Sequence, residues 1–456
     1  MIQLSKTILE TLLPDADFLG GDFTFTGVAT DSRAVSAGNL FVTWTGERCD
    51  GTQFCDAAVS AGACAVIADK PVDISTPQVI TRDPIKALGL IAAYWRDQFD
   101  IPVIAVTGSN GKTTVKNLLR SIFNVMTDGH CLAPTKSYNN HVGVPLTLCQ
   151  LDKTHKVAVI EMGMNHFGEI DYLTQIAKPD IALITNAYPN HTEFVHDVQG
   201  VASAKAEIFN GLKDKGMAVL NADDDFIDFW LERVAAFRVV KFGLEHAACV
   251  SAEKIQVSAK GVEFKLVTPL GVTPVRLPLL GKHNVYNALA AVAVLIGVRE
   301  RFGWAVTEAD LAKGLRHATA EPGRLAFKTS VNGHVVIDDT YNAGLASVLA
   351  AIEVLAGFKG KKVFVLGDLG ELTQAQLESF YTQIADFARA SKVDAVFTCG
   401  HSASRLSDAF SGESAHFTDK DKLVQSLKSQ DQTDVTFLIK GSRFMKMETL
   451  VTALCE

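Results

Sequence analysis

The stretch Ile104-Ala-Val-Thr-Gly-Ser-Asn-Gly-Lys-Thr-Thr114 decides the fold of this chain. It begins in an apolar, β-branched run (101–107), passes through a turn with two glycines (108–111) and enters a helix pattern at Lys112. A strand, a glycine turn and a helix N-terminus form a phosphate-binding loop, because glycines let the backbone approach phosphate oxygens and free helix amides point at the anion. The stretch therefore predicts a nucleotide site, with Lys112 on the β- and γ-phosphates and Thr113 near Mg²⁺.

The match to the strict phosphate-loop pattern is incomplete. The pattern G-x-x-x-x-G-K-[ST] requires a glycine at position 106, where this chain has Val106 and carries its glycine at 108 instead. A chance turn is the alternative interpretation. The flanking strand and helix supply the context that the motif needs, so they favour nucleotide binding.

Length and composition limit the classes of protein to consider. A length of 456 residues allows about three domains. The net charge of −8 does not favour a nucleic-acid surface, which needs clustered Lys and Arg. No signal peptide or membrane span is expected, since the longest apolar helix candidate (285–298) is too short and contains Asn287. The eight cysteines form no C-x-x-C pair and indicate reduced thiols in a cytoplasmic protein.

Alternating strand and helix patterns predict an α/β protein of three domains. We expect a small α/β N-terminal substrate domain at 1–97, a central phosphate-loop domain with a parallel sheet at 98–317, and a C-terminal Rossmann-like α/β domain at 318–456. Pro322-Gly323 marks a hinge before the last domain. Strands are expected over 25–30, 40–43, 65–68, 101–107, 157–162, 181–186, 217–220, 335–340, 363–366, 393–398 and 436–439. Helices are expected over 51–61, 84–98, 112–126, 200–212, 281–298, 345–356, 375–390 and from 445 onward.

Two strand ends place polar side chains beside the predicted phosphate loop. The run Val157-Ala-Val-Ile ends in Glu161, where Mg²⁺ would find an oxygen ligand, although a solvated acid is the alternative. His191 follows the next strand and could serve metal or substrate, although a lone histidine is more often structural. Lys205, taken alone, indicates a surface lysine paired with a nearby glutamate. In the first domain, Asp31-Ser-Arg33 taken alone indicates a turn with a solvated arginine.

Together these residues resemble the ATP-dependent Mur ligases of peptidoglycan synthesis, and the resemblance covers essentially the whole chain. The last-domain segments are similar to the branch of the family that adds a dipeptide, and the D-N-P-R motif of the branch that adds a diamino acid does not occur. The segments that carry the resemblance are Asp31-Ser-Arg33, Thr107-Gly-Ser-Asn-Gly-Lys-Thr-Thr114, Asn139-Asn140, Glu161-Met-Gly-Met-Asn-His-Phe-Gly-Glu169, His191, Ala204-Lys-Ala-Glu207, Gly281-Lys-His-Asn284, Pro322-Gly-Arg324, Asp338-Asp-Thr-Tyr-Asn-Ala343, Leu366-Gly-Asp368 and Lys440-Gly-Ser-Arg443.

The resemblance implies an activity and a set of small-molecule partners. The chain would use ATP and Mg²⁺ to join D-alanyl-D-alanine to the terminal carboxylate of UDP-N-acetylmuramoyl-tripeptide through an acyl phosphate. It would work in the cytoplasm as a monomer, without nucleic acid or membrane. Lys205 falls where the family carries a carbamylated lysine, which makes physical sense because an ammonium repels Mg²⁺ whereas a carbamate is an anionic oxygen ligand.

The resemblance also implies roles for individual residues. The implied catalytic set is Lys112, Glu161, His191 and Lys205, and the implied Mg²⁺ ligands are Thr113, Glu161, His191 and Lys205. The implied nucleotide contacts are Gly108, Ser109, Asn110, Gly111, Lys112, Thr113, Thr114, Asn287, Arg324, Asp339 and Tyr341. The implied substrate contacts are Asp31, Ser32, Arg33, Asn139, Asn140 and Asn342.

Three departures from the family pattern occur, and none touches the ATP machinery. The first two bear on the predicted contacts to the peptide and dipeptide substrates. The usual T-x-G-N-x-N-N appears as Thr135-Lys-Ser-Tyr-Asn-Asn140, and N-A-N-P-x-S appears as Asn342-Ala-Gly-Leu-Ala-Ser347. Cys49 replaces the phenylalanine of G-E-R-F-D-G. Two other functions stay open. One is a related ligase that adds a different amino acid, or glutamate as folylpolyglutamate synthases do, to another carboxylate, although the segments 338–343 and 440–448 argue against it. The other is a phosphate-loop NTPase that acts as a switch and couples hydrolysis to a partner.

Overall fold

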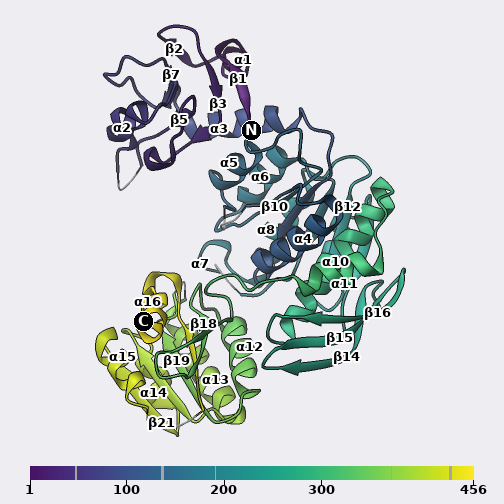
Figure 1. Ribbon diagram of the computed structural model, residues 1–456, viewed down its shortest axis with the longest axis vertical. Helices are drawn as coiled ribbons and strands as arrows, with labels where there is room; N and C mark the ends of the chain where they lie inside the picture. Colours follow the sequence, from purple (N-terminus) through teal and green to yellow (C-terminus); the bar gives the residue numbers. More distant parts are fainter. Residues whose placement is uncertain (47–48, 135–137, 190–191, 371, 431–433) are drawn as a thin grey trace.

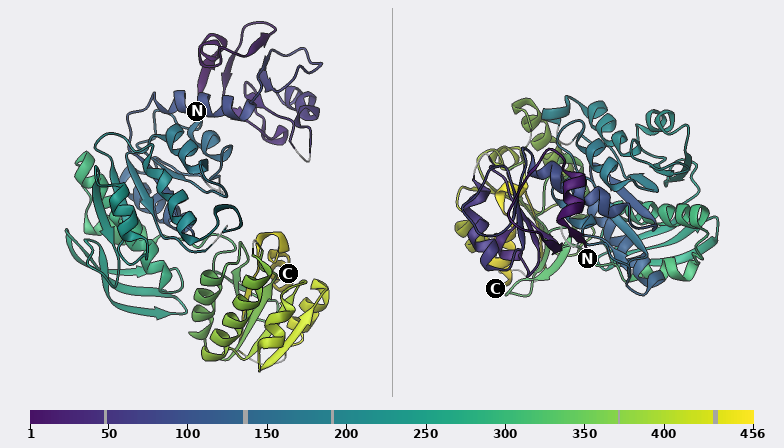
Figure 2. Two further views of the ribbon diagram at one scale, coloured as in Figure 1. Left: turned by 180° about the vertical axis from the view of Figure 1, so that it is seen from behind. Right: turned by 90° about the horizontal axis from the view of Figure 1, so that it is seen from above.

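Three α/β units follow one another along the chain, as predicted. The computed structural model describes residues 1–46, 49–134, 138–189, 192–370, 372–430 and 434–456. In Figures 1 and 2 the middle unit lies between the N-terminal and C-terminal units, and the three form a crescent. The exact boundaries between the units, at 97/98 and 317/318, stay predictions.

The N-terminal unit is built on a five-stranded sheet in the order β2-β7-β6-β5-β4. The expected helix near 51–61 contains α2 (Cys55–Ser60), and the one near 84–98 is α3 (Pro84–Arg96), which begins with a proline after its capping residue Asp83. The strand expected over 25–30 is divided into two at Gly27. The remaining elements are β1 (Gln3–Ser5), α1 (Lys6–Leu12), β2 (Asp17–Leu19), β3 (Thr24–Thr26), β4 (Val28–Ala29), β5 (Leu40–Val42), β6 (Ala65–Ala68) and β7 (Gln78–Ile80).

The middle unit contains a six-stranded parallel sheet in the order β13-β12-β11-β8-β10-β9. The phosphate-loop strand β8 (Val103–Thr107) is fully buried, because both faces of the sheet are covered by helices. The strands beside it are β10 (Val157–Glu161) and β11 (Ile181–Ile184), which correspond to the predicted strands 157–162 and 181–186. Their carboxyl ends lie on either side of the loop. The outer strands are β9 (Cys131–Leu132), β12 (Met217–Asn221) and β13 (Arg238–Phe242).

Helices cover the two faces of this sheet. One face carries α4 (Lys112–Thr127), α10 (His283–Phe302) and α11 (Glu308–Arg316). The other carries α5 (Gly143–Leu148), α6 (Glu169–Ala177) and α8 (Val198–Ala206), with α7 (Thr192–Val195) and α9 (Ile227–Arg233) nearby in the chain. An antiparallel sheet that the sequence did not predict follows, made of β14 (Ser251–Ser258), β15 (Gly261–Thr268) and β16 (Gly271–Leu277).

The C-terminal unit has a six-stranded sheet in the order β17-β18-β22-β19-β20-β21, parallel except for its edge strand β17. The predicted strands correspond to β18 (Val335–Asp339), β19 (Lys361–Gly367), β20 (Ala395–Cys399) and β22 (Val435–Lys440), while β17 (Ala326–Thr329) and β21 (Glu413–Phe417) were missed. Its helices are α12 (Leu345–Ala356), α13 (Gln374–Ala390), α14 (Ser404–Ala409), α15 (Lys420–Lys428) and α16 (Glu448–Cys455). In the described part of the chain, no helix combines the length and apolar character needed to cross a membrane.

Candidate active site

The phosphate loop lies between β8 and α4, where the sequence predicts it. Gly108 and Gly111 have φ angles of 149° and 85°, which residues with a side chain rarely adopt. Both glycines also lie close to neighbouring elements. A Cβ on Gly108 would lie 1.8 Å from the Thr185 hydroxyl, and one on Gly111 would lie 2.3 Å from Asn287 Oδ1. The loop therefore needs glycine at both positions.

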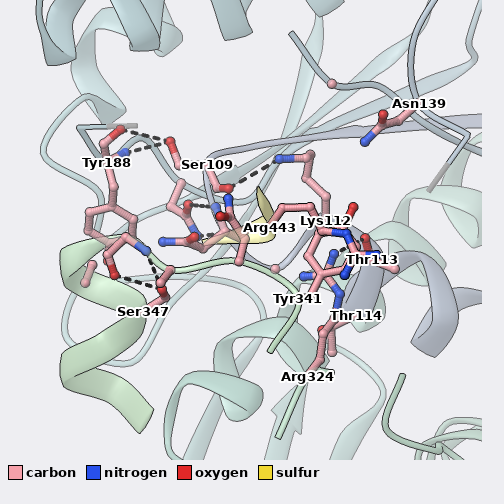
Figure 3. Close-up of a pocket in the computed structure, with 18 of the residues that line it drawn as sticks. Ser109, Lys112, Thr113, Thr114, Asn139, Tyr188, Arg324, Tyr341, Ser347 and Arg443 are labelled. Atoms are coloured by element: carbon pink, nitrogen blue, oxygen red, sulfur yellow. Dashed lines mark hydrogen bonds between the residues drawn. The ribbon is translucent and has the colours of Figure 1, made fainter. Parts of the chain in front are cut away.

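Lys112 folds back over this loop (Figure 3). Its Nζ donates hydrogen bonds to the carbonyl oxygens of Gly108, at 2.6 Å, and Ser109, at 3.3 Å. Burial lowers the pKa of Lys112 to about 8, and the nearby carboxylate of Glu161 partly opposes that shift. A phosphate placed on the loop would give this ammonium an anionic partner in place of neutral carbonyls.

Glu161 and Thr113 form a site whose chemistry fits a divalent cation. The Thr113 hydroxyl donates to Glu161 Oε1 at 3.1 Å, and Asn139 Nδ2 donates to the same oxygen at 2.9 Å. The other carboxylate oxygen, Glu161 Oε2, is buried and has no hydrogen-bond partner among the described residues. A buried, unsatisfied carboxylate oxygen beside a hydroxyl is a donor set that Mg²⁺ accepts. In the part of the chain described here, no group of three or more His, Cys, Asp or Glu side chains could by itself hold a metal ion.

Arg324 reaches this site from the linker before the C-terminal unit. Its Nη2 donates to the Thr113 hydroxyl at 3.0 Å, so Thr113 contacts both Arg324 and Glu161. The guanidinium carbon lies 4.0 Å from the centre of the Tyr341 ring. A cationic side chain of one domain therefore lies directly on the phosphate loop of another.

Lys205 is buried on α8, so its interpretation as a surface lysine paired with glutamate is wrong. Glu207 instead accepts hydrogen bonds from the backbone N–H groups of Gly168 and Asp171. Burial, and secondarily the charge of Lys112, hold the pKa of Lys205 well below its usual value. No hydrogen bond or ion pair from Lys205 is found among the described residues, and His191, the other predicted ligand on this side, lies outside them.

One cavity of about 1400 Å³ brings most of the predicted residues together. It lies between the middle and C-terminal units and contains neither Lys205 nor the Asp31–Arg33 segment in its lining. The predicted residues that line it are Ser109, Asn110, Gly111, Lys112, Thr113, Thr114, Asn139, Asn140, Glu161, Asn287, Arg324, Asp339, Tyr341 and Asn342.

Lys440 is a residue of this cavity to which the sequence assigned no role. It is buried at the end of β22, where its Nζ donates to Asp339 Oδ2 at 2.6 Å and to the carbonyl of Asn342 at 2.8 Å. The pair holds the segment 339–342, which carries three predicted contacts. The signal available in the sequence was a lysine that ends an apolar strand, at the same sheet edge as Asp339.

Asn140 and Asn139 have structural partners in addition to facing the cavity. Asn140 Oδ1 accepts the backbone N–H groups of Val142 at 3.2 Å and Gly143 at 2.9 Å, just where α5 begins. Asn139 donates to Glu161, as described above, and its carbonyl accepts the N–H of Gly163 at 2.8 Å. These contacts fix the loop after residue 137 against the phosphate site.

A second cavity, of about 1010 Å³, lies in the N-terminal unit. Asp31, Ser32 and Arg33 line it together with aromatic side chains that include Trp44 and Phe54. Arg33 Nη2 lies 2.7 Å from Asp31 Oδ2, and Asp31 Oδ1 accepts the N–H of Arg33, so a turn is formed as expected. The turn therefore borders a cavity that combines charged, hydroxyl and aromatic groups.

Comparison with known proteins places this geometry among enzymes. Three family models match the chain: "Mur ligase family, catalytic domain" over residues 24–97, "Mur ligase middle domain" over 106–295, and "Mur ligase, glutamate ligase domain" over 323–443. The chain is 38% identical to the UDP-N-acetylmuramoyl-tripeptide–D-alanyl-D-alanine ligase of Escherichia coli (strain K12), over 100% of this chain and 99% of the relative. It is 36% identical to the ligase of the same name from Haemophilus influenzae, with the same coverage. The crystal structure of MurF from Acinetobacter baumannii superimposes with a TM-score of 0.91 at 33% identity, over 100% of this chain and 99% of that one.

Proposed function

The chain belongs to the Mur ligase family, and we infer that it joins D-alanyl-D-alanine to UDP-N-acetylmuramoyl-tripeptide with ATP in peptidoglycan precursor synthesis. One observation carries this function. A single cavity unites a phosphate loop, a buried carboxylate with an unsatisfied oxygen, and an arginine of the C-terminal unit. Such an arrangement serves the transfer of a phosphoryl group to a substrate that the two domains hold between them.

The chemistry requires activation of a carboxylate, because hydroxide is a poor leaving group. The γ-phosphoryl group of ATP passes to the terminal carboxylate of the tripeptide, which gives an acyl phosphate and ADP. The amine of D-alanyl-D-alanine then attacks the acyl carbon and forms a tetrahedral intermediate. Phosphate leaves, and the products are the amide, ADP and phosphate.

Residues of the phosphate loop bind and orient the anionic groups. The backbone amides at the start of α4 and the ammonium of Lys112 receive the β- and γ-phosphates, whose mutual repulsion would otherwise oppose the reaction. Thr113 and Glu161 would hold Mg²⁺, which would offset phosphate charge. Arg324 lies close enough to Thr113 to meet the same phosphates.

Lys205 and His191 complete the proposed ligand set. The proposal of a carbamate on Lys205 is supported by the burial of a cation for which the described residues offer no acid. Addition of CO₂ to its neutral amine would replace that cation with an anionic oxygen ligand, and the amine proton would pass to water. The remaining nucleotide contacts are proposed for Asn287, Asp339 and Tyr341.

The acceptor substrate is proposed to span the two cavities. Asp31, Ser32 and Arg33 would bind the UDP-sugar in the N-terminal cavity, where aromatic rings offer a stacking surface for a base. Asn139, Asn140 and Asn342 would contact the peptide parts. We also propose domains at 1–97, 98–317 and 318–456, and a monomer that works in the cytoplasm.

An ADP-release assay tests the function. Purified protein receives ATP, Mg²⁺ and UDP-N-acetylmuramoyl-tripeptide, with D-alanyl-D-alanine, glutamate or nothing in three parallel reactions. Sustained ADP release is expected with D-alanyl-D-alanine alone among these. Release with glutamate would favour the folylpolyglutamate-like alternative, and an ATPase rate that ignores both acceptors would favour the NTPase switch.

A further inference from the structure

The linker around Arg324 is attached to both domains that border the cavity. At its start, Asn117 Nδ2 on α4 donates to Glu321 Oε2 at 2.7 Å. At its end, the N–H of Tyr341 donates to the carbonyl of Gly323 at 3.0 Å. The backbone of Arg324 is thus held by the C-terminal unit, while its guanidinium touches Thr113 of the middle unit. The side chain of Arg324 crosses the boundary between the two domains.

The guanidinium rests on a ring, and within the described ranges of the chain it forms no ion pair with a carboxylate. Its carbon lies 4.0 Å from the centre of the Tyr341 ring, its Nη2 donates to Thr113, and its Nε is buried without a hydrogen-bond partner among the described residues. Figure 3 shows Tyr341 and Arg324 beside Thr113, at the start of α4. Arg443 provides a contrast: its carbon lies 6.0 Å from the same ring, but its Nη1 is paired with Glu448 at 2.9 Å.

The difference between these two arginines has a chemical consequence. An acidic partner orients a guanidinium but occupies its N–H donors and neutralises its charge. An aromatic face orients the plane by a cation–π contact and leaves the charge and the donors at the edge available. Arg324 is therefore held in place by a ring, and no ion pair with an acid of the described residues neutralises its charge.

We propose that Tyr341 is a positioning residue for phosphoryl transfer that acts through Arg324. This inference rests on the proposed function, and it gives Tyr341 a role distinct from direct contact with the nucleotide. The Tyr341 ring fixes the orientation of the Arg324 guanidinium. In that orientation, an N–H group that now donates to the Thr113 hydroxyl can donate to the transferring phosphoryl group. Without the ring, the Arg324 side chain would be mobile, and its guanidinium would be poorly aligned with the phosphoryl oxygens in the transition state.

A double-mutant cycle tests the proposal. The variants are Tyr341→Leu, Tyr341→Phe, Arg324→Lys and the double variant Tyr341→Leu/Arg324→Lys, with Phe327→Leu as a control that removes an exposed ring elsewhere in the same domain. Tyr341→Leu is expected to lower kcat by about 10-fold while KM for ATP changes by less than about 3-fold. Tyr341→Phe should recover most of the rate, and Tyr341→Leu should cost little more once Arg324 is lysine.

A second measurement does not depend on catalysis. In protein labelled with ¹⁵N-arginine and free of nucleotide, the Arg324 guanidinium signal is identified by its absence in Arg324→Lys. That signal should move in Tyr341→Leu, because the ring current is lost, and stay near its position in Tyr341→Phe. The proposal is overturned if the signal does not move in Tyr341→Leu. It is also overturned if the kcat reductions of Tyr341→Leu and Arg324→Lys simply multiply in the double variant, or if Tyr341→Leu changes KM for D-alanyl-D-alanine instead of kcat. Failure of the proposed function looks different, since wild-type protein would then release no acceptor-dependent ADP.

Discussion

Helix α3 joins the N-terminal unit to the middle unit through apolar packing. In the linker at 317–325, Ala318 and Ala320 pack on the middle unit, and Glu321 and Arg324 meet it through hydrogen bonds. Leu88 and Ile91 of α3 are fully buried in one hydrophobic cluster with residues of α5 and α6. The C-terminal unit has hydrophobic clusters of its own, to which the middle unit contributes Leu280. Separating the first pair of units exposes a core, while separating the second mainly exchanges polar contacts for water.

We call the contact between the N-terminal and middle units the first joint, and the contact between the middle and C-terminal units the second joint. Arg96 adds a buried polar network to the first joint. Its side chain is 1% exposed and donates to the carbonyls of Ala177 at 2.9 Å and Phe99 at 2.8 Å, and it lies 3.7 Å from Asp180. It thereby satisfies the C-terminal end of α6 from another element. At the second joint, Arg324 donates to the Thr113 hydroxyl beside the phosphate loop, where we propose that its charge meets the phosphates. We therefore expect substitutions at the first joint to change mainly the free energy of unfolding, and substitutions at the second joint to change mainly kcat.

The largest effect is expected at the cavity beside the second joint. Lys112→Ala removes the ammonium from the phosphate loop and should lower kcat/KM by at least about 10³-fold, or about 4 kcal/mol. The free energy of unfolding should fall by less than about 1 kcal/mol, because a buried ammonium is itself costly. ADP release and urea unfolding measure the two quantities.

Lys153→Ala, at an exposed position of the same unit, is the matched control and should change neither quantity. Full activity in Lys112→Ala would remove the phosphate loop from the mechanism altogether.

At the first joint, Arg96→Met should have the opposite signature. It leaves the carbonyls of Ala177 and Lys178 without a donor and weakens the surroundings of Asp180, so the free energy of unfolding should drop by about 3 kcal/mol. The kcat of the folded fraction should stay within about 2-fold, since the network is remote from the phosphates. Urea unfolding and single-temperature kinetics provide the comparison.

Arg82→Met, an exposed arginine just before α3, is the control and should leave stability unchanged. If Arg96→Met lowered kcat without lowering the free energy of unfolding, the expectation that the first joint governs stability would be wrong.

A smaller effect is expected from His283, at the start of α10 beside the C-terminal unit. Burial lowers its pKa to about 4, against about 6.5 in an unfolded chain. Between these values the unfolded chain binds a proton that the folded chain does not, so the free energy of unfolding decreases as pH falls. In His283→Gln, the decrease in the free energy of unfolding between pH 7.5 and pH 5 should be smaller by about 1–2 kcal/mol than in the wild type.

Urea unfolding of both proteins at the two pH values measures the difference, and His317→Gln, an exposed histidine, is the control. Equal pH dependence in wild type and His283→Gln would show that this histidine titrates normally in the fold.

The parts of this molecule that follow from short stretches were predictable from the sequence. The phosphate loop and its strand and helix are encoded within a few residues, and Glu161 follows from one strand end next to that loop. The strand β14 was missed because most of its side chains are exposed and show no clean alternation. Only its pairing with β15 in the folded chain identifies it as a strand.

The burial of Lys205 and the pairing of Lys440 could not be predicted locally. Small residues around Lys205 look like a surface turn of helix, and only the packing of α8 against the sheet buries them. Lys440 and Asp339 are 101 positions apart, so their contact depends on β18 pairing with β22. The same holds for the ring of Tyr341 under Arg324, which needs the linker and the sheet edge together.

The smallest effect is expected where the linker leaves the middle unit. Asn117→Ala removes the hydrogen bond to Glu321 at the start of the linker, and one such bond contributes about 1 kcal/mol or less to stability. The linker backbone would gain freedom, and Arg324 would meet the phosphates less often, so kcat should fall by about 3- to 10-fold. Asn124→Ala on the same helix is the control, because Asn124 Oδ1 has no partner among the described residues. If Asn117→Ala instead lowered stability by about 3 kcal/mol with kcat intact, the second joint would behave like the first, and the assignment of rate to one joint and stability to the other would be wrong.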